Sequence, residues 1–180
     1  MALINAVAFD RDANRIPITQ YGFFNVSSKT LSANNTTASI PLFNVQGVCE
    51  IRALYGVVTT ALSSNITAAY WRLNDQTNQN AISLATGTTI SSFGVGAFVT
   101  RRSLVSVALV GSAATNGSVT DPVAATAPDV FMPFIVIQKT GGVQTDIEFT
   151  YSTTNTPASG AIDFYIGWVP LTPTSTITSY

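Results

Sequence analysis

The stretch VQTDIEFTY, residues 143–151, decides the fold of this chain. Successive side chains of a β-strand point to opposite faces, so its residues divide into two sets. One face carries Val143, Thr145, Ile147, Phe149 and Tyr151, and the other carries Gln144, Asp146, Glu148 and Thr150. This period of two predicts a strand that packs its apolar face against a core and turns its polar face to water.

The segment that follows repeats the pattern. Residues 161–169 alternate in the same way, and residues 153–160 between the two strands contain Pro157 and Gly160, which are typical of a turn-rich loop. We therefore expect the two strands to form a hairpin with a long loop. We also expect their apolar faces to share one core, made of Ile147, Phe149, Ile162, Phe164, Ile166 and Trp168.

Short runs rich in β-branched and aromatic residues predict further strands. These runs are residues 21–26, 39–43, 48–60, 68–73, 81–86, 104–110 and 131–137. The polar run 74–80 indicates a hairpin between its two neighbouring strands. The last two runs are almost continuously apolar, which is typical of strands buried on both faces, and Pro133 indicates an edge position or a bulge. In the long run 48–60, we expect one face to carry Ile51, Ala53, Tyr55 and Val57.

The whole pattern predicts an all-β fold, a two-sheet β-sandwich or jelly roll, because no segment places apolar residues at helical spacing. A length of 180 residues suits one domain over residues 1–180. Residues 1–20 and 170–180 are predicted to be an extended N-terminal arm and an extended C-terminal tail, since Pro17, Pro170 and Pro173 favour extended backbone. Residues 111–128 are predicted to be an exposed loop.

The composition excludes several classes of protein. Only 9% of the residues are charged and the net charge is -1, so no basic stripe is present to bind nucleic acid. No apolar run approaches the roughly 20 residues of a membrane span. The first ten residues lack the features of a signal peptide, so we expect synthesis in a cytoplasm. A weakly charged surface is prone to association, which favours a homo-oligomer or a bound partner.

The residues available for chemistry argue against an enzyme. Histidine is absent and Cys49 is the single cysteine, so we expect no catalytic triad, no thiolate metal site and no cofactor. Asp146 and Glu148 are the best carboxylate pair. They fit either an acid/base pair or a calcium site, or else the solvated face of an amphipathic strand, which the alternation favours. Trp71 beside Arg72 fits a stacking platform for a sugar or base, but core packing is the favoured interpretation.

The N-terminal arm is the predicted partner-binding segment. It combines apolar side chains with a cluster of charges of both signs, which gives specificity across an interface. The candidate residues are Leu3, Phe9, Asp10, Arg11, Asp12 and Arg15. Two alternatives remain open: the charged cluster is a solvated turn, or the arm is the first strand of the domain's own sheet.

Two stretches, each made of two segments, resemble parts of tailed-bacteriophage virion proteins. They are ALYGVVTT at residues 53–60 with LNDQ at residues 73–76, and FTYSTT at residues 149–154 with AIDFYI at residues 161–166. The class that the chain resembles most is the capsid decoration, or cement, proteins. That resemblance implies a β-sandwich or jelly roll, often trimeric, that binds a major capsid protein or another virion protein on the outside of the head. It implies a location in the virion after synthesis in the host cytoplasm, and no catalytic residues.

The function expected from the sequence is therefore non-enzymatic stabilisation of a phage capsid. A phage tail or head-fibre module that binds a host-surface carbohydrate or receptor is the alternative. Such a module would need exposed aromatic side chains with polar groups around a groove.

Overall fold

The computed structural model describes residues 22–83, 87–101, 110–112 and 133–180. Their strands form two antiparallel sheets. The first sheet contains β1 (Phe23–Thr30), β10 (Ala161–Pro170), β3 (Val48–Thr60), β6 (Phe98–Thr100) and β7 (Val110–Ser112) in that order, with β8 (Phe134–Ile137) also paired to β3. The second sheet contains β11 (Thr176–Ser179), β2 (Thr37–Gln46), β9 (Asp146–Thr153), β4 (Ile66–Asn74) and β5 (Gln79–Ala81). No helix in these ranges is long and apolar enough to cross a membrane.

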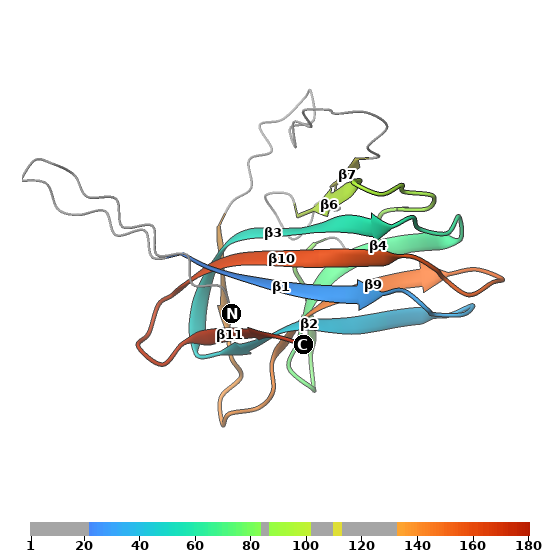
Figure 1. Cartoon of the computed structure of the whole chain (residues 1–180). Coiled ribbons are helices and arrows are strands. Elements are labelled where there is room, and N and C mark those ends of the chain that lie inside the picture. Colours follow the sequence, from blue (N-terminus) through green and yellow to red (C-terminus); the bar gives the residue numbers. More distant parts are fainter. Residues whose placement is uncertain (1–21, 84–86, 102–109, 113–132) are drawn as a thin grey trace, which may run out of the picture.

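The two sheets pack face to face, and β3 and β10 lie over β4 and β9 (Figure 1). Aromatic rings from both sheets meet at the centre. The centroid of the Trp71 ring lies 5.2 Å from that of Phe149 and 5.3 Å from that of Phe164, and the Phe149 and Phe164 centroids are 4.9 Å apart. All six side chains of the predicted core are buried. The all-β class and the β-sandwich are therefore confirmed, whereas a jelly roll is not established.

The predicted hairpin of residues 143–151 with residues 161–169 is wrong. Strand β9 pairs with β2 and β4 in the second sheet, whereas β10 pairs with β1 and β3 in the first. The connection crosses from one sheet to the other and passes close to the segment after β3. Gly160 has a φ of +115°, and a Cβ there would lie 2.7 Å from the Ala61 carbonyl oxygen. Only glycine fits this crossover.

Strand β3 has the predicted bounds but changes face in its middle. Opposite the Gly167–Trp168 step of β10, residue Arg52 is an extra residue, so the strand contains a β-bulge. Ile51 before the bulge faces the core, and Leu54 after it faces the core as well. The prediction that Ile51 shares a face with Ala53, Tyr55 and Val57 is therefore wrong, because those three residues face outward.

The shorter strands agree in part with the sequence. The hairpin around residues 74–80 is confirmed, since β4 pairs with β5 from Arg72 opposite Ala81 to Asn74 opposite Gln79. Its second strand, predicted at residues 81–86, is Gln79–Ala81 instead, and residues 84–86 lie outside the described residues. Strand β8 follows Pro133 and, within the described residues, pairs only with β3, which agrees with the predicted edge position. The prediction that this run is buried on both faces is wrong, because Ile135 and Ile137 are exposed.

The two ends of the chain differ. The arm of residues 1–20, the predicted strand from residue 104 to 109 and most of the predicted loop 111–128 lie outside the described residues. Residues 170–180 are not the extended free tail that was predicted, because residues 171–174 form a turn and the chain then returns as a strand. Strand β11 extends the second sheet by pairing with β2, and Ile177 is buried in the core. The backbone oxygen of Tyr180 accepts hydrogen bonds from Ser27 Oγ (3.2 Å) and Lys29 Nζ (3.3 Å) of β1, which ties the two sheets together at this edge.

Candidate functional site

The predicted partner-binding residues of the arm are not placed by the structure. Leu3, Phe9, Asp10, Arg11, Asp12 and Arg15 all lie outside the described residues. Trp71, the other candidate contact, is fully buried between the sheets. Core packing is thus confirmed for Trp71, and its interpretation as a stacking platform is wrong.

The acidic pair of β9 is buried, although the sequence favoured a solvated strand face. The Asp146 and Glu148 residues are only 2% and 6% exposed. Both side chains point away from the core, on the outer face of the second sheet. Because β9 lies between β2 and β4, polar side chains of both neighbours close over the two carboxylates.

Each carboxylate has its own set of donors. Glu148 accepts a hydrogen bond from Arg72 Nε at 2.7 Å, which is also an ion pair, and one from Asn74 Nδ2 at 2.9 Å. These bonds occupy both carboxylate oxygens. Arg72 Nη1 donates in turn to Gln79 Oε1 at 2.6 Å. A carboxylate that is buried and bonded in this way holds strands together and offers a substrate no free oxygen.

The donors around Asp146 come from three separate parts of the chain. Asn44 Nδ2 and the Tyr180 hydroxyl donate to Oδ1 at 2.9 and 2.7 Å, and Gln144 Nε2 donates to Oδ2 at 2.7 Å. These N–H and O–H groups point their hydrogens at the carboxylate, where a calcium ion would need free oxygen ligands. Burial and the hydrogen bond to Asp146 raise the pKa of Tyr180 to about 12, so its hydroxyl stays a donor at neutral pH.

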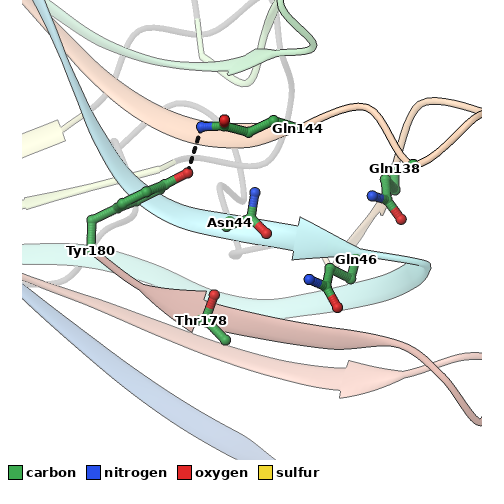
Figure 2. A pocket seen from close by; sticks show the side chains of 7 residues that line it. Asn44, Gln46, Gln138, Gln144, Thr178 and Tyr180 are labelled. Atoms are coloured by element: carbon green, nitrogen blue, oxygen red, sulfur yellow. Dashed lines mark hydrogen bonds between the residues drawn. The ribbon is translucent and has the colours of Figure 1, made fainter.

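A groove of about 400 Å³ opens beside Asp146 on the outer face of the second sheet (Figure 2). We call it the amide groove. It is lined by Asn44 and Gln46 of β2, Gln138, Gly142 and Gln144 of the loop before β9, and Thr178 and Tyr180 at the C-terminal end. Amide and hydroxyl groups dominate the lining, and none of the described residues contributes a charged side chain to it.

Part of the outer face of the first sheet is apolar instead. On the edge strand β1, Phe24 and Val26 are 41% and 46% exposed. Val26 pairs with Tyr165 of β10, which pairs with Tyr55 of β3, and the two tyrosine rings stack with centroids 5.0 Å apart. We call the surface formed by Phe24, Val26, Tyr55 and Tyr165 the aromatic face.

The aromatic face depends on a glycine beneath it. Phe24 pairs with Gly167, and a Cβ on Gly167 would lie 3.0 Å from the Phe24 ring. The phenylalanine ring can therefore lie close to β10 because residue 167 has no side chain.

The sequence analysis did not predict the aromatic face, because β1 alternates with its polar residues toward the core and its apolar residues outward. Its inward side carries the polar residues Asn25 and Ser27, while its outward side carries Phe24 and Val26. Asn25 Oδ1 accepts a hydrogen bond at 2.9 Å from Nε1 of Trp168, which makes the buried amide tolerable. The sequence signal for this surface is the alternation in β1, in which the apolar residues Phe24 and Val26 lie on the face opposite to Asn25 and Ser27.

Comparison with protein-family models, with curated proteins and with solved structures finds no match for this chain.

Proposed function

We propose that this protein is a non-enzymatic virion structural protein that binds the outer surface of a phage capsid and stabilises it. The observation that supports the proposal best is the aromatic face, an exposed apolar surface on an otherwise regular sheet. Exposed apolar surface with a polar surround is typical of a protein-protein contact. The bacteriophage assignment itself comes from the sequence resemblance described above.

The partner on the aromatic face is expected to be an uncharged, apolar patch of a capsid subunit. Phe24 and Val26 are each about half exposed, so covering them contributes roughly 1 kcal/mol apiece at about 25 cal/mol per Å². Tyrosine is enriched in protein interfaces, and the stacked Tyr55 and Tyr165 rings are already ordered before binding. In an oligomer, the linked copies would add such modest energies together.

The arrangement of Asp146 and Glu148 supports a role without catalysis. General acid/base chemistry needs a carboxyl oxygen within hydrogen-bond reach of a substrate. The carboxylate oxygens of Glu148 accept hydrogen bonds from Arg72 and Asn74. Those of Asp146 accept hydrogen bonds from Asn44, Gln144 and Tyr180. These bonds join β2, β4 and β9, which is a structural task.

Particle association tests the proposal. The untagged chain is produced during phage assembly, particles are banded by density-gradient centrifugation, and the chain is detected with an antibody. We expect the chain in the particle band at a fixed copy number, and we expect particles that lack it to break at lower temperature. Absence of the chain from the particle band would exclude the virion role.

A matched pair of variants tests the surface. Val26→Asp places a charge on the aromatic face, and Val95→Asp places the same charge on an exposed valine of the loop before β6. Both variants should fold, since both side chains point to solvent. We expect Val26→Asp to lose particle binding and Val95→Asp to keep it. Equal binding of the two variants would show that another surface carries the contact.

A second function, binding of a host-surface carbohydrate, is favoured by one specific observation. The amide groove combines a half-exposed aromatic residue, Tyr180, with uncharged polar side chains. Binding of such a ligand does not depend on the capsid proposal.

A further inference from the structure

We propose that the amide groove is a binding site for a neutral oligosaccharide. Five of its seven lining residues, Asn44, Gln46, Gln138, Gln144 and Thr178, carry amide or hydroxyl groups, and the sixth polar residue is Tyr180. Sugar hydroxyls donate and accept hydrogen bonds at once, so they are matched by side chains that present both kinds of group at close spacing.

Several of these groups are available to a ligand. Within the described part of the chain, the protein provides no hydrogen-bond partner for Oδ1 of Asn44, Oε1 of Gln144, Nε2 of Gln46 or Oγ1 of Thr178. Two of these atoms are acceptors, one is a donor, and the hydroxyl is both. The groove therefore offers acceptors and donors together, as one pyranose edge with neighbouring hydroxyls requires.

The same side chains are held in place from behind. The amide nitrogens of Asn44 and Gln144 both donate to the buried Asp146 carboxylate, at 2.9 and 2.7 Å. This fixes their orientation and turns their carbonyl oxygens away from Asp146. Gln46 Oε1 accepts a hydrogen bond from Thr176 Oγ1 at 3.2 Å, which leaves its amide nitrogen free. Groups oriented before binding lose little entropy when a ligand arrives.

The wall formed by residues 138–145 is fixed as well. The backbone N–H of Gln138 donates to the Gly47 carbonyl oxygen at 2.8 Å, and the backbone N–H of Gly47 donates to the side-chain Oε1 of Gln138 at 3.1 Å. Lys139 N donates to Thr145 Oγ1 at 3.1 Å. The loop is thus bonded both to the β2–β3 turn and to its own far end, so the groove exists before a ligand binds.

Tyr180 gives the groove its aromatic surface. Its hydroxyl donates to Asp146 and accepts from Gln144 Nε2 at 2.7 Å, as Figure 2 shows for the second bond. Both contacts fix the ring at one end of the groove, while about half of the residue stays exposed. The apolar face of a pyranose packs on such a ring while its hydroxyls reach the amides.

The lining also argues against other ligands. In the part of the chain that the structure describes, no lysine or arginine lines the groove, and Asp146 lies behind it, so an anionic ligand would meet no opposite charge there. A peptide strand adds to a sheet along its free edge. The amide groove lies on the face of β2 and β11, not along that edge, so it does not offer a peptide a row of backbone partners.

A titration with a panel of neutral oligosaccharides tests the proposal. Binding is monitored by NMR of the full chain labelled with nitrogen-15. The panel contains tri- and tetrasaccharides of glucose, galactose, mannose and N-acetylglucosamine, with a sulfated glycan as the anionic probe. We expect at least one neutral probe to shift the side-chain amide signals of Gln46 and Gln144. No shift by any neutral probe at about 10 mM, or binding of the sulfated probe alone, would overturn the assignment.

Two single substitutions in the groove locate the ligand. Thr178→Val removes one hydroxyl and keeps the shape of the side chain, and Gln46→Ala removes the free amide donor. Each should weaken binding about tenfold, the equivalent of one hydrogen bond at about 1.4 kcal/mol. The matched control is Thr59→Val, at an exposed position near the end of β3 on the other sheet, which should bind as the unaltered chain does. Unchanged affinity in both groove variants would show that the sugar binds elsewhere and would overturn the proposal.

Discussion

Neighbouring residues of β10 have opposite roles. Phe164 is fully buried and its ring contacts those of Trp71 and Phe149, whereas Asp163 faces outward beside Val57 of β3 and Ser28 of β1. The two side chains are adjacent in sequence, so a comparison between them isolates the effect of facing the core.

Phe164→Ala is expected to lower the free energy of unfolding by about 3–5 kcal/mol, because it leaves a cavity between the two sheets. Asp163→Ala is expected to change it by no more than about 0.5 kcal/mol, because this side chain lies outside the core and is only partly buried. Chemical denaturation followed by tryptophan fluorescence measures both. Small and equal effects would show that the assigned core face of β10 is wrong.

At the scale of whole elements, the two ends of the chain are predicted to differ. Strand β11 pairs with β2, buries Ile177 and brings Tyr180 to Asp146. The arm before β1 is the segment that the sequence assigns to partner binding. One end is therefore part of the sheet, and the other is proposed to act outside it.

Two truncations test this difference. Removal of residues 174–180 should lower the free energy of unfolding by at least about 3 kcal/mol, because it uncovers the core beneath Ile177 and leaves Asp146 without one donor. Removal of residues 2–15 should leave a cooperative thermal transition and abolish particle binding. An unfolded product of the second truncation would mean that the arm is a strand of the domain, and normal particle binding would mean that the arm is not needed.

At the scale of the whole molecule, surface chemistry decides how copies associate. The chain has only 17 charged side chains (8 basic and 9 acidic) among 180 residues. Three of the described charges, those of Asp146, Glu148 and Arg101, belong to buried residues. The exterior is therefore largely neutral, and neutral amide and hydroxyl surface costs less to desolvate than surface rich in lysine and glutamate.

The purified chain is accordingly expected to form an oligomer, a trimer by the resemblance to decoration proteins. Because few charges are involved, the oligomer should persist when the salt concentration is raised, since salt screens only charged contacts. Sedimentation velocity at several protein concentrations and at low and high salt measures this. A monomer at every concentration, or dissociation by salt, would contradict the prediction.

The sequence by itself determined the local structure. Alternation of apolar and polar residues located β3, β9 and β10, identified the six core side chains of the last two strands, and placed Trp71 inside. It succeeded because the direction of a side chain along a strand depends on a period of two, which is a local property. Gly, Pro and polar runs marked the turns for the same reason.

Only the tertiary structure decided which strands are neighbours. It placed β9 and β10 in different sheets, put a bulge at Arg52, buried Asp146 and Glu148, and assembled the amide groove from segments around Asn44, Gln144 and Tyr180. These features depend on pairing between residues far apart in the chain, and a local pattern has the same form whichever strand lies beside it. The sequence of β9 predicts a solvated polar face, because it contains no information about its neighbours. In the structure, polar side chains of the neighbouring strands cover that face.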